Sequence, residues 1–497
     1  MNTSLWFPPL VLACSLLPAI IIFLLPEQRH RLRTLVNLGA ALLKLALVMV
    51  MVWGVFHGKQ YYFSLQVLPQ VALVLSADAL SVMFAGLSSL LWLWTTVYAI
   101  GYLQGTENRG RFFGFFSLCV ASTLGIALAG NLFTFFIFYE MLTLSTYPLL
   151  VHKGTPEALA AGRRYLIYTL TGGALLLAGI AWLQTLAGDL DFQAGGHQAL
   201  ATMSVIDLRI IFFLLIAGLG VKAALVPLHG WLPGAMVAPA PVSALLHAVA
   251  VVKAGVFGIL RVIYDTFGIG FSQSLGVLEP LAVIAAITIL YGSIRALQQQ
   301  DLKRRLAFST VSQVSYVTLG AALFGPLGTI GGLVHLIHQG LMKITLFFCA
   351  GSYAETLGSK RIDQLDGAGK RMPWTSLAFT IGAFGMIGLP PLAGFISKWY
   401  LATGALASTL PWILAVLIAS TLLNAAYFLP ILHRLWFRQP PAQWPDETRT
   451  ENWESHPWLL APALFTALAV ILVGILAGMP FSPLSWAQLI ASREYLP

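Results

Sequence analysis

Apolar residues form long runs along this chain, and short polar segments separate the runs. Many runs reach about 20 residues, the length that an α-helix needs to cross the hydrocarbon core of a bilayer. Because lipid offers the backbone no hydrogen-bond partners, such segments are expected to cross it as helices. The pattern predicts an all-α polytopic membrane protein with about 14 transmembrane helices, at residues 5–25, 34–56, 73–102, 112–129, 131–151, 163–187, 206–228, 240–262, 274–294, 304–324, 327–351, 375–403, 410–432 and 457–478.

The composition agrees with this prediction and excludes several kinds of site. Hydrophobic residues make up 58% of the 497 residues and charged residues only 9%, against roughly 25% charged in an average soluble domain. The segment 5–25 has no basic region before its apolar run, so we interpret it as the first span rather than as a signal peptide. The three cysteines lie in apolar segments without a CxxC pattern, which excludes a cysteine-built zinc or iron–sulfur site. We expect no cofactor and no metal.

The net charge of +9 is better explained by the positive-inside rule than by binding to nucleic acid. Loops after odd-numbered spans contain 19 basic residues. Loops after even-numbered spans and the C-terminal tail contain only Lys59, Arg209, Arg261 and Arg493. This asymmetry predicts a multi-pass protein of the inner (cytoplasmic) membrane, with odd-numbered loops in the cytoplasm and both termini outside it.

Six charged residues lie inside the expected spans, where a charge at the bilayer centre costs about 2.5 to 3.5 kcal/mol. They are Glu140, Lys44, Lys222, Lys253, Lys343 and Lys398. Glu140 and Lys222 lie on separate spans and can neutralise each other, with an attraction of about 4 kcal/mol at 4 Å and an effective dielectric of about 20. A static ion pair that only fixes helix packing is the alternative for these two residues. One glutamate cannot neutralise the other lysines, so some of them are expected to be neutral or to contact water.

Histidines accompany the lysines and can move protons near physiological pH. His247 precedes Lys253 on the eighth span. The eleventh span contributes His335, His338, Gln339 and Lys343. Three of these residues are spaced four apart and fall on one helix face. Haem ligation by His247 and His335 is an alternative, which the neighbouring lysines disfavour.

Two spans contain glycine and proline, which interrupt a helix. One break follows Lys222, in the stretch 223–233, and the other precedes Lys398, at 388–394. The interrupted spans are the seventh and the twelfth, as expected for two inverted five-helix repeats with an ion site near the breaks; ordinary proline kinks are the alternative. The predicted regions are 1–111 (three N-terminal helices), 112–262 (first repeat), 274–437 (second repeat) and 438–497 (C-terminal loop and last helix).

Several motifs in the chain resemble those of the antiporter-like subunits of complex I, of membrane-bound hydrogenases and of Mrp cation/proton antiporters. They are Phe138-Tyr-Glu140, Val221-Lys222 with Pro227-Leu-His229-Gly-Trp-Leu-Pro233, Ala240-Pro-Val-Ser-Ala-Leu-Leu-His247 with Lys253, Asp301 to Thr310, His335 to Lys343, and Gly388 to Phe395. The resemblance implies a horizontal polar axis for proton transfer through Glu140, Lys222, Lys253, His335 and Lys398. Position 398 is lysine rather than glutamate, as in several members of the family. His229, His247, His338 and Lys343 are candidates for an auxiliary proton path.

The whole chain looks most like the D-type subunit of Mrp antiporters, which implies a proton-translocating subunit of a multisubunit monovalent cation (Na⁺)/proton antiporter. The alternative is an antiporter-like subunit of an NADH-quinone oxidoreductase-like complex, a membrane hydrogenase or an inorganic-carbon uptake complex. A passive scaffold and a quinone-binding subunit are further hypotheses. The expected partners are other membrane subunits, lipid, protons and Na⁺. No flavin, nicotinamide or iron–sulfur signature is present, so we expect no redox centre and no catalytic residue in this chain.

Overall fold

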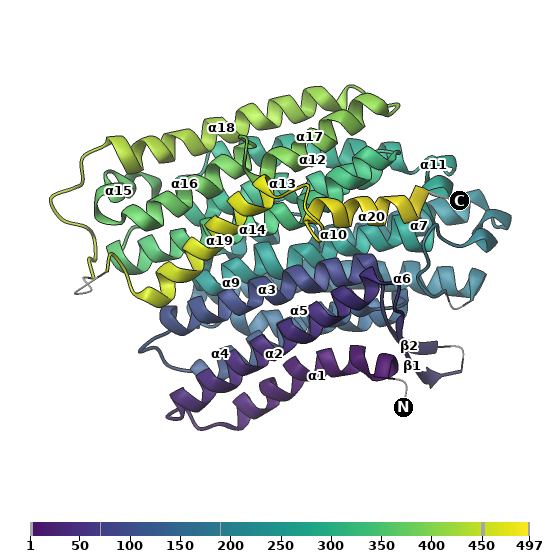
Figure 1. Cartoon of the computed structure of the whole chain (residues 1–497), viewed down its shortest axis with the longest axis horizontal. Helices are drawn as coiled ribbons and strands as arrows, with labels where there is room; N and C mark the ends of the chain where they lie inside the picture. Colours follow the sequence, from purple (N-terminus) through teal and green to yellow (C-terminus); the bar gives the residue numbers. More distant parts are fainter. Residues whose placement is uncertain (1–2, 70, 189, 449–452, 496–497) are drawn as a thin grey trace.

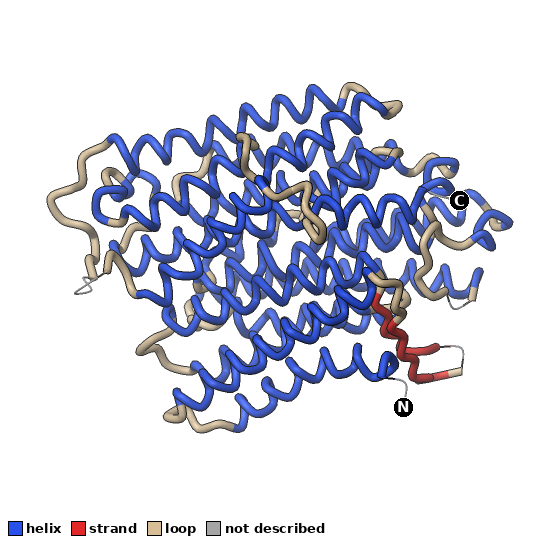
Figure 2. Tube along the Cα trace, in the orientation of Figure 1, coloured by secondary structure: helices blue, strands red, loops and turns tan. Residues whose placement is uncertain are grey.

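Long helices running side by side make up almost all of the chain (Figures 1 and 2). The computed structural model describes residues 3–69, 71–188, 190–448 and 453–495. Its N-terminal helices are α1 (Thr3–Leu24), α2 (His30–Phe56), α3 (Ala79–Tyr102), α4 (Arg109–Leu128), α5 (Leu132–Leu150), α6 (Pro156–Ala187) and α7 (Val205–Lys222). The second half contains α12 (Leu278–Leu297), α13 (Leu302–Ala322), α14 (Pro326–Leu357), α16 (Pro373–Ile387), α17 (Ala393–Ala407), α18 (Ile413–Phe437), α19 (Pro457–Ile475) and α20 (Pro483–Tyr495).

Shorter elements connect these helices. After α7 come α8 (Trp231–Gly234) and the 3₁₀ turn η2 (Ala235–Val237). The eighth span is a series of α9 (Ala240–Ala244), the π-turn η3 (Leu245–Val249), α10 (Val251–Arg261) and the π-turn η4 (Val262–Thr266). The remaining short elements are η1 (Gln198–Thr202), α11 (Ile269–Ser274), η5 (Ile362–Leu365) and α15 (Ala368–Arg371).

Each expected span coincides with a helix or an interrupted helix, so the predicted fold class is confirmed. Among the described residues, 11 helices are long and apolar enough to cross a membrane. The other three expected spans have distinct reasons to fall outside this set. The 18 residues of α7 include Asp207, Arg209 and Lys222, α13 begins with Lys303-Arg-Arg305 and is rich in serine and threonine, and the twelfth span is divided between α16 and α17.

Local sequence explains where several helices begin. The side chain of Asn131 accepts a hydrogen bond from Thr134 N at 2.8 Å before α5, and that of Asp301 accepts one from Arg304 N at 2.8 Å before α13. Thr155 plays the same part before α6, where Pro156 occupies the first helical position. Such caps satisfy backbone N–H groups that have no partner inside the helix. They fix where these three spans start, including the one that carries Glu140.

The beginning of the third expected span, 73–102, is wrong. Residues 71–77 form strand β2 (Val71–Ala77), which pairs antiparallel with β1 (Tyr61–Leu68), and α3 begins only at Ala79. Figure 2 shows this hairpin in red at one end of the helical bundle. The alternating burial of β2 suits a strand with one face inward. A window that averages hydropathy merges such a strand with the apolar helix that follows it.

Both broken helices are confirmed. α7 ends at Lys222, and Ala224 adopts a left-handed φ of 56° that stops the helix. The Trp231 Nε1 group donates to the Val221 carbonyl at 2.7 Å, which satisfies a group that the break would leave unpaired. In the twelfth span, residues 388–392 separate α16 from α17. The boundaries of the two repeats stay a prediction.

The basic loops gather at one end of the bundle. Arg109 N donates to Glu27 Oε1 at 2.7 Å and the Arg111 side chain donates to His152 O at 3.3 Å, which joins the loops after the first, third and fifth spans. A cavity of about 450 Å³ at this end is lined by Lys153, Lys303 and Lys360 among others. The start of α1, the end of α20, the hairpin and α11 lie at the opposite end (Figure 1). The basic residues predicted for the loops after odd-numbered spans therefore lie at one end of the bundle, opposite the end that carries the hairpin and α11.

Candidate functional site

The carboxylate of Glu140 projects from α5 against α6. Glu140 is half-buried, and its Oε1 atom is buried without a hydrogen-bond partner among the described residues. It lies against Gly173 of α6, where any side chain would meet the carboxylate. A buried carboxylate oxygen without a protein partner is expected to bind water or a proton.

Lys222 is fully buried at the last residue of α7, where the helix dipole favours a positive charge. Its Nζ donates to the carbonyl of Tyr139 and lies 3.3 Å from the centre of the Tyr139 ring. Among the described residues, no ion pair joins Lys222 to Glu140. The described structure therefore does not contain the static ion pair that was the alternative for these two residues. The physical reason is that Lys222 turns toward the residue before Glu140, while Glu140 faces Gly173.

Replacing Gly173 with alanine is expected to displace the Glu140 carboxylate, because the new Cβ would lie only 2.8 Å from Glu140 Cδ. Because the group that must move is the end of a flexible side chain, we expect a cost near the lower end of the about 1 to 3 kcal/mol that overpacking costs. We expect a clear loss of transport with a modest fall in the melting temperature of the purified protein. Gly39→Ala is the matched control, since a Cβ at Gly39 meets nothing within 4 Å. Equal transport by both variants would contradict this placement of Glu140.

The eighth span bends at a π-turn that positions His247 and Lys253. His247 is fully buried, stacks on Phe347 of α14 with ring centres 4.6 Å apart, and has no hydrogen-bond partner for either ring nitrogen among the described residues. Lys253, in the first turn of α10, donates from Nζ to Leu336 O of α14 at 2.6 Å. π-turns inside helices often occur at functional sites. This turn was not predicted from the sequence, because its own residues include no glycine or proline.

His335 joins the eleventh and twelfth spans. Its Nδ1 lies 2.9 Å from Ser397 Oγ of α17, and its ring stacks on Tyr316 of α13 with centres 5.0 Å apart. The carbonyl that accepts from Lys253 belongs to Leu336, the next residue. His335 thus connects the part of α14 that binds Lys253 to α17.

Lys398 reaches back from α17 across the break in the twelfth span. Its Nζ donates to Ile387 O at 2.8 Å and to Thr421 Oγ1 of α18 at 3.2 Å. It also lies 5.8 Å from the centre of the Tyr316 ring that stacks on His335. The carbonyl at the end of α16 is free to accept this bond because the helix stops there. The twelfth span therefore repeats the arrangement of the seventh, where a lysine lies beside a break.

Lys343 forms a branch from the axis toward α18. Its Nζ donates to Ser309 Oγ at 2.7 Å and to Leu306 O at 3.1 Å, and Ser309 Oγ lies 2.9 Å from the Tyr427 hydroxyl. Between this branch and His335, the side chains of His338 and Gln339 are buried and have no hydrogen-bond partner among the described residues. Buried polar groups of this kind normally bind ordered water.

The five lysines inside the spans share one property. Four of them are fully buried, and Lys398 is half-buried. In the part of the chain that the structure describes, none of the five forms an ion pair. Each donates only to carbonyl or hydroxyl oxygens. The carbonyl oxygens that bind Lys222 and Lys253 can accept from the ammonium and from the N–H groups of a neutral amine. The hydroxyl groups beside Lys44, Lys343 and Lys398 can also donate to a neutral amine. The arrangement is chemically suited to residues that gain and lose a proton.

Two of the charged or titratable residues lie apart from this chain of contacts. His229 lies half-buried in the turn after α7, where its ring packs edge-on against Tyr291 with centres 4.9 Å apart. Lys44 is fully buried between the first helices, where its Nζ donates to Ser15 Oγ at 3.1 Å and lies 3.1 Å from the centre of the Trp92 ring. The contacts of both residues involve groups outside the axis. The structure therefore does not place them in the same hydrogen-bonded path.

Sequence reasoning missed two kinds of residue. The hydroxyl groups of Ser309, Ser397 and Tyr427 contact the titratable residues or each other, but single serines and tyrosines in apolar spans carry no signal of their own. Arg261 was assigned to an external loop, and that assignment is wrong. The side chain is fully buried within the span Ala240–Thr266, bound by two aspartates. An aspartate four residues after an arginine was the available signal.

Comparison with known proteins identifies relatives of this chain. Residues 129–424 match the family described as NADH:quinone oxidoreductase/Mrp antiporter, TM. NADH-quinone oxidoreductase subunit N from Desulforudis audaxviator is 37% identical over 410 residues, 79% of each chain. The D-type subunit of the Na(+)/H(+) antiporter from Alkalihalophilus pseudofirmus is 28% identical over 409 residues, 80% of each chain. In the structure of the Mrp complex from Dietzia sp., a chain with 25% identity superimposes with a TM-score of 0.88, covering 100% of this chain and 98% of that one.

Proposed function

The chain belongs to the NADH:quinone oxidoreductase/Mrp antiporter family of membrane proteins, and we propose that within it this protein is the proton-translocating subunit of a multisubunit monovalent cation/proton antiporter of the Mrp D type. Protons are passed along Glu140, Lys222, Lys253, His335 and Lys398. Na⁺ is the exchanged cation. The proposal is supported by two relatives that carry the name of the D-type subunit of a Na(+)/H(+) antiporter and match over most of their length. The superposition on a chain of an Mrp complex also supports it.

The observation that carries the proposal is that the three lysines of the axis, Lys222, Lys253 and Lys398, form no ion pair among the described residues and donate to carbonyl and hydroxyl oxygens. An uncompensated ammonium inside a membrane protein is costly, so the neutral amine is accessible to these groups. Lys253 donates to the carbonyl of Leu336, the residue next to His335 on α14. The Tyr316 ring stacks on His335 and also lies near Lys398 Nζ. Between Lys253, His335 and Lys398 a proton can therefore move in short steps, with water bridging the buried atoms that have no protein partner.

In the proposed mechanism, half-channels from the two membrane faces meet this axis. When Lys222 approaches Glu140, the ion pair favours the ammonium, and when the two separate, as in this structure, burial favours the neutral amine. The released proton passes to Lys253 and His335. Lys398 loads or unloads at the far end. His247, His338 and Lys343 extend the path, whereas His229, which packs against Tyr291 outside the axis, is left out of it.

A second candidate function is favoured by one specific observation. The relative named NADH-quinone oxidoreductase subunit N is 37% identical, against 28% for the D-type antiporter subunit. In that case the same axis would translocate protons in response to electron transfer in partner subunits. The two candidates differ in the driving reaction and not in the residues of the axis.

The test uses everted membrane vesicles from antiporter-deficient cells that make this chain with its neighbouring subunits. A pH-sensitive dye reports the pH gradient after Na⁺ is added, for the wild type and for Glu140→Ala. Na⁺-dependent collapse of the gradient that is lost in the variant is the expected result. A chain that does not respond to Na⁺ but lowers proton pumping when Glu140 is replaced would instead favour the redox-coupled candidate.

We also propose that the protein lies in the inner membrane with the basic end of the bundle in the cytoplasm and the end carrying α20 outside. The positive-inside rule supports this orientation. A reporter fused after the last residue should be active only outside the cytoplasm. Activity confined to the cytoplasm would reverse the assignment.

A further inference from the structure

A buried arginine gathers carboxylates at the end of the bundle where α1 begins and α20 ends. Arg261, the last residue of α10, binds both oxygens of Asp78 at 2.5 and 3.0 Å and Asp265 Oδ2 at 2.8 Å. Its Nη2 group also donates to Ser81 Oγ at 2.6 Å. Asp78 itself caps α3 by accepting from Ser81 N at 2.7 Å. The structure therefore ties the helix that carries Lys253 to the start of α3.

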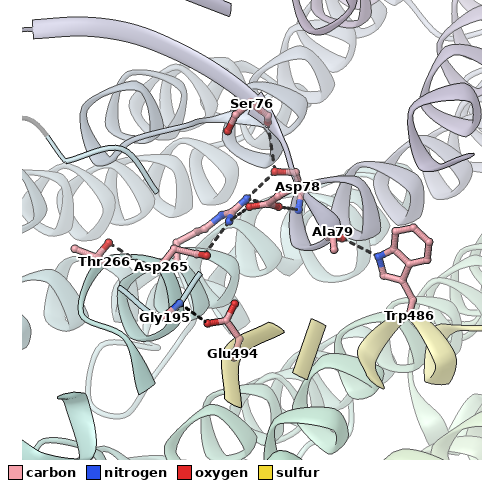
Figure 3. Close-up of polar contacts among 10 residues, drawn as sticks. Ser76, Asp78, Ala79, Gly195, Asp265, Thr266, Trp486 and Glu494 are labelled. Atoms are coloured by element: carbon pink, nitrogen blue, oxygen red, sulfur yellow. Dashed lines mark hydrogen bonds and ion pairs between the residues drawn. The ribbon is translucent and has the colours of Figure 1, made fainter. Parts of the chain in front are cut away.

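A third carboxylate lies in the same cluster and comes from the C-terminal helix. Glu494 of α20 accepts a hydrogen bond from Gly195 N at 3.1 Å, and Figure 3 shows it on the side of Asp265 that faces away from Asp78. Trp486 holds α20 in place by donating to Ala79 O at 2.8 Å (Figure 3). Among the described residues, Arg261 is the one cation that forms ion pairs in this cluster, and it binds Asp78 and Asp265. One positive charge cannot compensate three carboxylates, and Glu494 is the one without an ion pair in the part of the chain that the structure describes.

The groups around Glu494 come from five segments. α10 contributes Arg261, η4 contributes Tyr264 and Asp265, the start of α3 contributes Asp78, and α20 contributes Tyr495 and the exposed Arg493. The segment 191–197, which supplies the Gly195 N–H, also carries Asp191 and His197. Burial, followed by the neighbouring charge of Asp265, raises the pKa of Glu494 to about 8, against the opposing effect of the Gly195 hydrogen bond. The carboxyl group is therefore neutral below about pH 8 and ionised above it.

Hydroxyl groups beside this cluster meet at the first turn of α14. The Tyr495 hydroxyl lies 3.0 Å from Thr329 Oγ1 of α14, and the Tyr264 hydroxyl donates to the same Thr329 oxygen at 3.1 Å. Thr329 is six residues before His335 on α14, a rise of about 9 Å. Arg261 is eight residues after Lys253 along α10, about 12 Å. Two helices thus connect the cluster to the middle of the axis.

The other side of the cluster reaches the surface. The Asp78 side chain is 38% exposed, while Arg261 is 0% and Asp265 5% exposed. Gly195, whose N–H binds Glu494, is exposed. The cluster therefore spans from solvent at this end to the hydroxyl groups at the start of α14.

From this placement we infer that Glu494 is the group that exchanges protons between the buried axis and the water at this end of the protein. The Glu494 carboxylate accepts a proton from one side of the cluster and becomes a neutral carboxylic acid. It then releases the proton on the other side of the cluster and is a carboxylate again. Arg261 binds Asp78 and Asp265 directly, whereas Glu494 forms no ion pair among the described residues and accepts only from Gly195 N, so Glu494 is the member that changes its protonation. This inference rests on the proposed function, since it supplies the outlet of the same proton path.

The test compares Glu494→Gln with Glu279→Gln in the full-length protein. Glu279 is an exposed carboxylate on the first turn of α12, away from the cluster. We expect Glu494→Gln to lower the proton flux roughly a hundredfold, as for the loss of a positioned proton-transfer group, and Glu279→Gln to leave it unchanged. Infrared difference spectra of the purified protein should contain the carbonyl band of a protonated carboxylic acid below about pH 8 that disappears above it. Glu494→Gln should lack this band.

The outcomes separate this inference from the proposed function. Unchanged flux in Glu494→Gln, with flux abolished in Glu140→Ala, would overturn the role of Glu494 alone. Normal flux in both variants would overturn the proposed axis as well. Reduced flux without any change in the infrared band would assign Glu494 a structural role and would also overturn the inference. Both the loss of flux and the loss of the band are needed to support it.

Discussion

Replacing Glu140 with alanine is expected to abolish proton-coupled transport while the protein still inserts and assembles. Glu140 directly follows Tyr139, whose carbonyl and ring bind Lys222, so its carboxylate is the acidic group next to the site of Lys222. Without this carboxylate, the ammonium form of the fully buried Lys222 loses its counter-charge, so the first proton transfer has no driving force. A loss of at least about a hundredfold in rate is expected for such a group.

Two comparisons make this result specific. Glu279→Ala removes an exposed carboxylate from α12 and should leave transport unchanged. Glu140→Asp keeps the charge and should retain part of the activity. The amount of protein in the membrane, measured on blots of the same vesicles, should be equal for all three variants. Normal transport by Glu140→Ala would show that Lys222 does not depend on this carboxylate.

Replacing Arg261 with alanine is expected to give the largest loss of stability. The substitution leaves Asp78 and Asp265 as carboxylates without their cation at a site where Arg261 itself is 0% exposed. Breaking a buried ion pair by removing one partner costs about 3 to 5 kcal/mol. The same change also separates α10 from the start of α3, to which Asp78 binds as a cap. Unfolding of the purified protein in detergent, followed by the melting temperature, measures the effect.

The control for this prediction removes the whole charged group. In a triple variant, Arg261→Met, Asp78→Asn and Asp265→Asn, the buried arginine and both of its partners lose their charges together, so most of the lost stability should return. The exposed pair Arg361–Asp363, with side chains 54% and 46% exposed, provides a second comparison, because surface ion pairs contribute only about 0 to 1 kcal/mol. A destabilisation of Arg261→Ala no larger than that of Arg361→Ala would contradict the account of the cluster.

The fold could be predicted because every segment that crosses the membrane must be an apolar helix of about 20 residues. Apolar length and basic loops were sufficient to place the helices, and glycine with proline located the breaks beside Lys222 and Lys398. The hairpin was missed because β2 is as apolar as the start of a span. The π-turn at His247 was missed because its residues, Leu245–Val249, include no glycine or proline. The local sequence pattern therefore predicts neither the hairpin nor the π-turn.

The candidate site was predictable by residue type and not by contact. The lysines could be identified because a charged side chain inside an apolar span has a high free-energy cost and is therefore expected to be functional. Their partners could not be predicted, because backbone carbonyls such as that of Leu336 are present at every position of every helix. The separation of Glu140 from Lys222 follows from the direction of their side chains, since Lys222 at the end of α7 turns toward Tyr139 and Glu140 on α5 lies against Gly173. Arg261 was misplaced because a charge near the end of a span looks the same in sequence whether it faces water or a buried aspartate.

The central claim is that protons travel through one specific set of lysines, and Lys44 provides the matched control. Lys44 and Lys253 are both fully buried, but only Lys253 binds the helix that carries His335. The decisive measurement is the proton flux through proteoliposomes that contain the full-length protein with its partner subunits, for Lys253→Met and Lys44→Met. The account predicts that flux is abolished in Lys253→Met and retained in Lys44→Met. Retained flux in Lys253→Met, or equal loss in both variants, would contradict it.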